Sequence, residues 1–449
     1  MPSALALISE PVIKLDRCTR REILHYFQNA WQLEDMLLRT ITQPDFFYEN
    51  PDPLRNPLIF YLGHSAVFYI NKFKWVGLLD EPINESYENL FEVGVDPANA
   101  AELQAATAHI QWPAVHDVWQ YRAAAYDVIT RLIESAVMTL PISPEAPLWA
   151  LMMAIEHQRI HIETSSMLLR QFPIDQLRRP DQWQYAPTFG AILDNPMISC
   201  EGGAVELGKP WDFPLYGWDN EYGSKQVTVA PFTVSQYMIT NGEFQEFVAA
   251  GGYQNPQYWN EASWQWRTEF AINQPKFWLP SEHGYRYRAM FDAMELPLDW
   301  PVEVNHYEAM AYCRWRGARL LTEAEWQWLA YGTTSSAPLR CGDANSHNYN
   351  LSLRFGSPSP VGYAEKNSPQ GTVKDIRGNV WEWLSDNFEP LSGFAAHYLY
   401  EDNSVPFFDG QHKMMLGGCW ITNGTEALRF YRNWFRPSFY QHAGFRIAL

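Results

Sequence analysis

Apolar side chains recur at helical spacing through the N-terminal part of the chain. Residues 20–41 and 57–79 show this pattern, and residues 97–139 predict one or two further helices interrupted at Pro113. Residues 148–171 contain no glycine or proline and are rich in Leu, Met, Ala, Ile and Glu, a composition typical of a long helix. Four main helices joined by loops predict an antiparallel bundle.

The pattern changes between residues 172 and 196, where three prolines fall within a polar stretch, so we expect domains at residues 1–190 and 191–449. The second domain is rich in Gly, Trp, Tyr and Asn, with short strand-like runs such as QVTVAPFTV. Helices are predicted at 240–250, where a capping box begins, at 308–316 and at 322–331. The predicted fold class is α+β: a helical bundle followed by a domain with little regular secondary structure.

Composition and charge narrow the class of protein. The chain has 449 residues, including 20 Trp, 24 Tyr and 25 Phe, which favours aromatic packing and a ring-lined pocket. Its net charge of −18 argues against nucleic acid or an anionic membrane as a partner. The five cysteines are scattered without a C-x-x-C motif, and no run of about 18 apolar residues occurs. We therefore expect a cytoplasmic protein with reduced thiols; the oligomeric state stays open.

The segment 156–163, EHQRIHIE, carries the most specific chemical signal. His157 and His161 are four residues apart, so on a helix both imidazoles lie on one face and can reach one ion. The alternative is two unrelated histidines on a packed helix. Apolar neighbours argue against it, because uncoordinated imidazoles are costly to bury, and Glu156 and Glu163 are candidate acceptors for the outer ring N–H groups.

A third histidine, His64, lies in the second apolar helical segment and completes a candidate metal site. The site does not match the zinc protease motif H-E-x-x-H, because Gln158 stands where that motif needs its general base. We therefore expect a metal site without protease activity.

The second domain resembles the formylglycine-generating-enzyme fold over roughly residues 195–449. The resemblance depends on PFTVSQYMITNGEFQEFVAAGGY, PVEVNHYEAMAYCRWRGARLLTEAEWQWLA, GNVWEW, LGGCW and HAGFR. True formylglycine-generating enzymes use a cysteine pair just after the GGSW-like motif, whereas here Trp420 is followed by Ile-Thr-Asn-Gly. The resemblance therefore implies the fold and not that activity, and Cys419 is expected to be a small packed residue.

The first domain resembles DinB-like bundles. With GHSAVFYINK and EHQRIHIETS, the whole chain resembles the iron-dependent sulfoxide synthases of ergothioneine and ovothiol biosynthesis. In that family three histidines hold a non-haem Fe(II), which uses O2 to join a thiol to an imidazole carbon of a histidine derivative. The resemblance implies that His64, His157 and His161 are the ligands. Three neutral imidazoles suit Fe(II) and leave coordination positions open.

The same resemblance implies further site residues. A tyrosine in the loop after GNVWEW supplies a proton in the family; here residues 393–404 contain Tyr400, our first candidate, and Tyr398, our second, and the alternative is that both only pack. Asn433 is expected to hydrogen-bond the substrate imidazole, and Trp434 to border its cationic amine. The last two candidates, Arg432 and Arg436, either pair a substrate carboxylate or form structural ion pairs.

Two features found in other family members and not here bear on the choice of substrates: an aspartate after the Trp, and a fused methyltransferase domain. Family members that use γ-glutamylcysteine have an aspartate after the Trp, and Phe435 here favours free cysteine. No fused methyltransferase follows the core, which favours hercynine, whereas the bundle motifs look closer to the ovothiol branch, which uses histidine. Nothing in the residues decides which imidazole carbon is attacked. A non-catalytic binding module with a structural zinc is the alternative of a different class.

Overall fold

The protein is described here by a computed structural model that covers residues 9–92, 94, 96–97, 99–332, 349–363 and 373–449. The described chain forms two compact units. The helical unit comprises Ser9–Gln182 with the short segment Pro214–Tyr216, and the C-terminal unit comprises Trp183–Phe213 with residues 217–449. Among the described residues, no helix has both the length and the apolar character that crossing a membrane requires.

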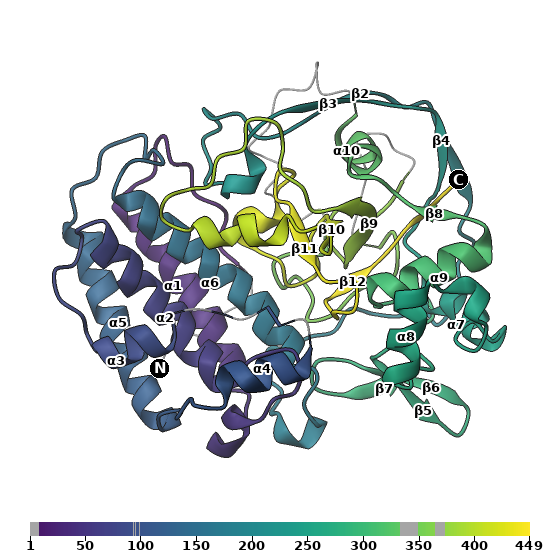
Figure 1. The fold of residues 1–449 in the computed structure, drawn as a ribbon, viewed down its shortest axis with the longest axis horizontal. Coiled ribbons are helices and arrows are strands. Elements are labelled where there is room, and N and C mark those ends of the chain that lie inside the picture. The colour runs from purple at the N-terminus through teal and green to yellow at the C-terminus, as the bar shows by residue number, and fades with distance from the viewer. Residues whose placement is uncertain (1–8, 93, 95, 98, 333–348, 364–372) are drawn as a thin grey trace. The chain divides into compact units, whose positions relative to one another are not determined.

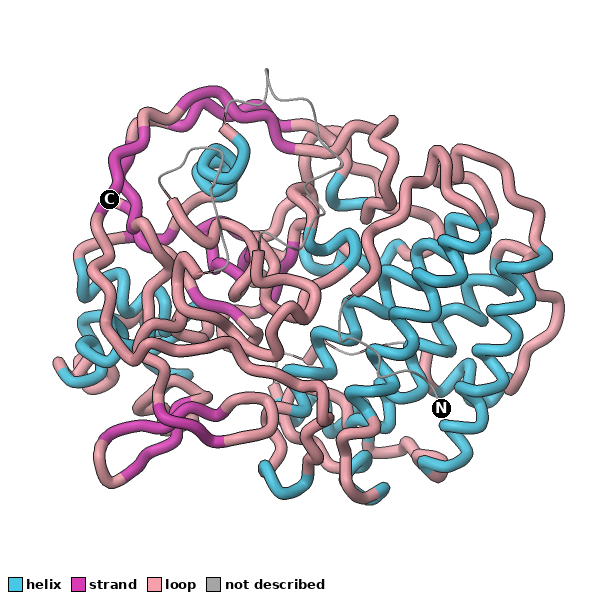
Figure 2. Tube along the Cα trace, turned by 180° about the vertical axis from the view of Figure 1, so that it is seen from behind, coloured by secondary structure: helices cyan, strands magenta, loops and turns pink. Residues whose placement is uncertain are grey.

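Four long helices make up most of the helical unit, and they lie side by side in both views (Figures 1 and 2). They are α1 (Arg20–Leu38), α2 (Leu58–Trp75), α5 (Val115–Ser135) and α6 (Leu148–Leu169). Two short helices, α3 (Glu85–Leu90) and α4 (Ala100–Thr107), lie between α2 and α5 in the chain, and short 3-10 helices cover Pro44–Tyr48 and Ile174–Gln176. The predicted interruption at Pro113 is confirmed, since α4 and α5 lie on either side of it.

Helices α2 and α6 form the centre of this unit. Almost every residue of α6 is buried, and α6 packs against both α1 and α2. Residues 58–70 of α2 are also buried on all sides, so the two helices are apolar around most of their circumference. Polar side chains on these helices must therefore find their partners inside the protein.

The described part of the C-terminal unit forms four small sheets, and strands of these sheets are labelled in Figure 1. The first has the order β1 (Met197–Cys200), β4 (Phe232–Ser235), β13 (Ile447–Ala448) and β8 (Arg319–Leu320); the second has the order β11 (Asn433–Phe435), β10 (Lys413–Leu416), β9 (Trp381–Asn387) and β12 (Ala443–Gly444). The other two sheets pair β2 (Gly203–Leu207) with β3 (Lys225–Val229), and β5 (Trp278–Ser281) with β6 (Gly284–Arg288) and β7 (Ala293–Glu295). All pairs are antiparallel except β9 with β12.

The described α-helices of this unit each begin after a residue whose side chain caps the first turn. They are α7 (Asn241–Ala249), α8 (Glu261–Glu269), α9 (His306–Arg316) and α10 (Glu323–Tyr331), with 3-10 helices at Asp219–Glu221, Pro256–Tyr258, Glu401–Asn403, Val405–Phe407 and Gly424–Ala427. The capping box at Thr240 is confirmed, since its hydroxyl accepts from the Glu243 amide at 3.2 Å. Helix α8 was not predicted, because the apolar residues of its short sequence EASWQWRTE alternate with polar ones and do not recur at helical spacing.

One aromatic and aliphatic core joins α10 to the first two sheets. Trp326 of α10, Leu384 of β9, Met414 of β10 and Val234 of β4 belong to it. The described cysteines (Cys18, Cys200, Cys313 and Cys419) are buried thiols that form no disulfide with one another. Cys419 lies 3.2 Å from the Thr422 hydroxyl in the tight LGGCW turn, the packed position that the sequence predicts. The predicted α+β fold class is thus confirmed, with helix and sheet residues packed into a shared core in the C-terminal unit.

Candidate functional site

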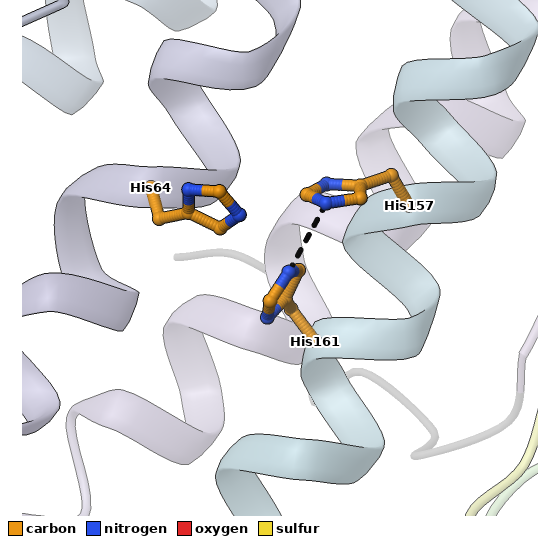
Figure 3. A group of neighbouring side chains, drawn as sticks. All are labelled: His64, His157 and His161. Carbon is orange, nitrogen blue, oxygen red and sulfur yellow. Dashed lines mark hydrogen bonds between the residues drawn. The ribbon is translucent and has the colours of Figure 1, made fainter. Parts of the chain in front are cut away.

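His64 of α2 and His157 and His161 of α6 converge inside the helical unit (Figure 3). One nitrogen from each ring can be chosen so that all three lie within 4.8 Å of one another, the single such cluster of three metal-binding side chains within the described ranges. The Nε2 atoms of His157 and His161 are 3.2 Å apart. Two nitrogens bound at about 2.1 Å to one ion lie about 3.0–3.4 Å apart, so this pair has the spacing of neighbouring ligands.

The backbone carbonyl of Phe91 fixes the orientation of His64. Nδ1 of His64 lies 2.6 Å from that oxygen, which can only accept, so Nδ1 carries the proton and donates it. The lone pair of Nε2 is then available toward the other two rings (Figure 3). Sequence reasoning missed Phe91, because a backbone carbonyl has no side-chain signature.

Burial keeps the three imidazoles neutral. It lowers the pKa of His64 to about 4, and it lowers the pKa values of His157 and His161 well below the ordinary range, with a further contribution from the neighbouring histidines. The His157 ring stacks on Phe68 at 3.7 Å, and the His64 ring stacks on Phe60 at 4.8 Å. Neutral, fixed and convergent imidazoles are a donor set that fits a divalent first-row transition metal.

Glu156 and Glu163, the acidic residues near the histidines in the sequence, are both buried on α6. The Glu156 carboxylate accepts a hydrogen bond from the Tyr26 hydroxyl of α1 at 2.8 Å. The role of these carboxylates as acceptors for ring N–H groups stays a prediction.

The two candidate tyrosines lie in the C-terminal unit with different surroundings. Tyr400 is half-buried with its ring 6.4 Å from that of Trp218, and burial, reinforced by Asp402 and Asp219, raises its pKa to about 12. Tyr398 is 46% exposed and stacks on His397 at 4.8 Å. Of the two side chains, Tyr400 is the less exposed.

Asp219 anchors the loop that carries Tyr400. Its Oδ1 atom accepts from the Ser404 hydroxyl at 2.6 Å and from the Asn403 amide at 3.0 Å. The backbone N–H of Asn220 adds a third hydrogen bond to the same oxygen at 2.8 Å. This carboxylate therefore fixes the end of the tyrosine loop, and sequence reasoning missed it because residues 219 and 404 are far apart in the chain.

Strand β11 carries Asn433 and Trp434 on opposite faces, because successive side chains of a strand alternate. Trp434 stacks on Phe388 at 4.2 Å with nearly parallel rings, against the core of the unit. The side-chain Oδ1 atom of Asn433 accepts from the Trp434 backbone N–H at 2.9 Å. The structure thus fixes both side chains but does not bring them to one face of the sheet.

The two arginines differ in their contacts. Arg432 is buried and makes a bidentate pair with Glu323, from Nε at 2.8 Å and from Nη2 at 3.1 Å, and it also donates to the Asn220 carbonyl at 3.2 Å. Arg436 is half-buried and donates to the Gln411 side chain at 3.1 Å. Of the two alternatives for Arg432, the ion pair is the one that the structure contains.

Comparison with known proteins shows which family and which relatives the chain resembles. Residues 190–449 match the family described as sulfatase-modifying factor enzyme 1-like domain. A hercynine oxygenase of Mycolicibacterium thermoresistibile is 28% identical over 94% of this chain and 95% of its own, and one of Mycolicibacterium smegmatis is 30% identical over 73% and 77%. Ergothioneine biosynthesis protein 1 of Neurospora crassa is 26% identical over 94% of this chain, which spans 57% of that protein.

The fold and the site therefore define a protein with a sulfatase-modifying-factor-like domain and a helical unit that carries three convergent histidines. The chain belongs to the ergothioneine sulfoxide synthase family.

Proposed function

We propose that the protein is a non-haem Fe(II)- and O2-dependent sulfoxide synthase that joins cysteine to the imidazole ring of hercynine in ergothioneine biosynthesis. The observation that carries the proposal is the convergence of three neutral imidazoles, two buried and one half-buried, in a chain whose relatives include hercynine oxygenases. Buried cysteines that stay as thiols support a reducing compartment, which we take to be the cytoplasm.

His64, His157 and His161 would hold the iron. When bound, Fe(II) supplies the redox chemistry that lets O2 oxidise a thiol sulfur, and three protein ligands leave positions open for small molecules. The residues themselves provide neutral nitrogens, and stacked Phe60 and Phe68 fix two of the rings. Overall, an imidazole C–H and a cysteine S–H are lost, a C–S bond and an S=O bond form, and the second oxygen atom leaves as water.

Tyr400 is the proposed proton-handling group. Its hydroxyl is protonated at neutral pH, and because burial raises its pKa to about 12, it would give up that proton only to a strongly basic group formed in the reaction. Tyr398, which is more exposed, is the second candidate. The Asp219 contacts with the loop would limit the movement of Tyr400 and so keep its hydroxyl aimed in one direction.

Substrate recognition is proposed to involve residues 433–436. Asn433 would hydrogen-bond the imidazole, and the ring of Trp434 would meet the trimethylammonium group, although Phe388 covers one of its faces. Arg436 would pair the carboxylate, whereas Arg432, already bound to Glu323, would hold the strand. Phe435 favours free cysteine as the thiol donor.

One aerobic assay tests the proposal. The Fe(II)-loaded protein is given cysteine with equimolar hercynine and histidine, and the products are read by mass spectrometry. The expected product is hercynine plus cysteine plus one oxygen, less two hydrogens. Preferential use of histidine would instead indicate an ovothiol-type 5-histidylcysteine sulfoxide synthase, which the bundle motifs favour. If neither imidazole is consumed, a non-catalytic metal-containing binding module becomes the better description.

A further inference from the structure

A buried carboxylate in the helical unit connects the two helices that carry the histidines. Glu34 of α1 is fully buried, and its Oε2 atom accepts from the Ser65 hydroxyl at 2.7 Å and from the Gln158 side-chain amide at 2.8 Å. Ser65 belongs to α2, and Gln158 belongs to α6. One oxygen atom of α1 therefore links α2 to α6 across the interior of the bundle.

The two residues that Glu34 binds are the sequence neighbours of two candidate ligands. Ser65 follows His64, and Gln158 follows His157. Consecutive residues of an α-helix differ by about 100° around the axis and about 1.5 Å along it, so each pair occupies adjoining faces of one helical turn. The hydrogen bonds to Glu34 therefore act at the level of the histidines and restrain the rotation of both helices there.

Two further side chains complete this network. Arg122 of α5 compensates the charge of Glu34, with Nη2 3.0 Å from Oε2, and its Nη1 donates to the Ser65 hydroxyl at 2.9 Å and to the Leu62 carbonyl at 3.0 Å. The Tyr69 hydroxyl donates to the Gln158 carbonyl oxygen at 2.8 Å, which fixes which way that amide points. All four long helices are thus tied to one another through hydrogen bonds that meet beside the histidines.

We propose that Glu34 is a positioning residue for the metal centre, which it holds in register through Ser65 and Gln158. Packing alone fixes helix separation only to within what side chains tolerate, whereas a shared acceptor with two donors restrains separation and rotation together. A buried ion pair adds little to stability compared with an apolar replacement, which leaves specificity of arrangement as the role of this one. The inference rests on the proposed metal site.

The test measures metal binding rather than turnover. The full-length chain is loaded with Co(II) under anaerobic conditions, and its affinity is obtained by competition with a chelator while the visible spectrum reports the ligand geometry. We expect Ser65→Ala and Glu34→Gln each to weaken Co(II) binding about 10-fold to 100-fold and to change the spectrum, as loss of outer-shell support does elsewhere. Ser65→Thr keeps the hydroxyl and should restore most of the affinity.

Asp35→Asn is the matched control. Asp35 lies on the same helix and binds the same arginine, at 2.7 Å, but the described contacts link it to neither ligand helix except through Arg122. It should leave the Co(II) affinity within about twofold of the parent value. If Ser65→Ala and Glu34→Gln lower the melting temperature but leave affinity and spectrum like those of Asp35→Asn, the inference is overturned.

Two provisions keep the test decisive. If Glu34→Gln does not fold, Ser65→Ala alone decides. That variant keeps the ion pair between Glu34 and Arg122 and removes the hydrogen bond that connects Glu34 to α2. His161→Ala is measured in the same series: full Co(II) affinity in that variant would refute the metal site itself, a different failure from that of the positioning role.

Discussion

At the scale of single residues, burial decides the chemistry of this protein. The histidines remain neutral because the interior disfavours their charged forms, and the same penalty raises the pKa of Tyr400 to about 12. Burial thus frees nitrogen lone pairs in one unit and makes a phenol a weaker acid in the other.

Removing either histidine of α6 should remove the iron. We expect His157→Ala and His161→Ala to lower iron content by more than about tenfold and to abolish sulfoxide formation. Each variant leaves two imidazole ligands, which bind the ion more weakly than three. Iron analysis and circular dichroism measure content and fold. His116→Ala, which changes an exposed histidine of α5, is the control and should keep both iron and activity. Full iron and turnover in either α6 variant would show that the ligands are elsewhere.

Replacing the proposed proton donor should change the product and not the metal. Tyr400→Phe keeps the ring and removes the hydroxyl, so iron content should stay while the product shifts from the sulfoxide toward cysteine sulfinic acid. Mass spectrometry gives the ratio of the two products. Tyr398→Phe should leave that ratio unchanged; the reverse pattern would transfer the role to Tyr398.

At the scale of elements, short strands and helix ends are held by buried charges. Arg432, the residue before β11, pairs with Glu323 at the start of α10, and the carboxylate of Glu308 caps α9 by accepting from the Asn305 backbone N–H at 2.9 Å. Each contact joins an element too short to be stable alone. Changes at these residues should therefore act on stability first.

Replacing the two arginines that flank β11 should separate an effect on stability from an effect on substrate binding. Arg432→Leu leaves Glu323 buried without its partner and should lower the free energy of unfolding by about 3–5 kcal/mol. Arg436→Leu should change it by less than about 0.5 kcal/mol, while raising KM for hercynine about tenfold. Denaturant titration and steady-state kinetics measure the two effects. Equal losses of stability would contradict the binding role of Arg436.

The α9 cap predicts a pH dependence of stability. Burial raises the pKa of Glu308 to about 7, although the Tyr253 hydroxyl donates to it at 2.6 Å. Between about 4.5 and 7 the folded state binds a proton that the unfolded state has lost, so this group's contribution to stability falls as pH rises, by about 3 kcal/mol in total. Denaturant unfolding at pH 4.5 and pH 7.5 measures it. Glu308→Gln keeps the capping box and should flatten the dependence; an unchanged slope would assign it to another group.

At the scale of the whole molecule, the proposed functions are divided between two units with separate cores. The metal ligands belong to the helical unit, and the candidate tyrosines and residues 432–436 belong to the C-terminal unit. A ligand that binds one unit stabilises that unit directly.

Removing the metal should therefore weaken the helical unit selectively. A free metal concentration of about 100 times Kd raises the free energy of unfolding of the unit that binds it by about 2.7 kcal/mol. A chelator should therefore lower the unfolding temperature of the helical unit by several degrees. Differential scanning calorimetry, with tryptophan fluorescence to follow the Trp-rich C-terminal unit, resolves the two. An equal shift of both transitions would mean that the metal stabilises the whole chain as one cooperative body.

Much of this organisation follows from local patterns in the sequence. The spacing of four residues places His157 and His161 on one face of any α-helix, whatever surrounds it. Apolar periodicity located the long helices, and Thr240 with Glu243 located a helix start, because both depend only on nearby residues.

Other features were decided by tertiary structure alone. The Phe91 carbonyl that orients His64 has no side-chain signature, and Glu34, Ser65 and Gln158 meet only because four helices pack together. Pairing of β11 with β10 separates Asn433 from Trp434, although they are neighbours in the chain. The sequence by itself thus determined that His157 and His161 share one helix face, since helix geometry is local, and packing between distant segments decided how these two residues meet His64 and how the three rings are oriented and held.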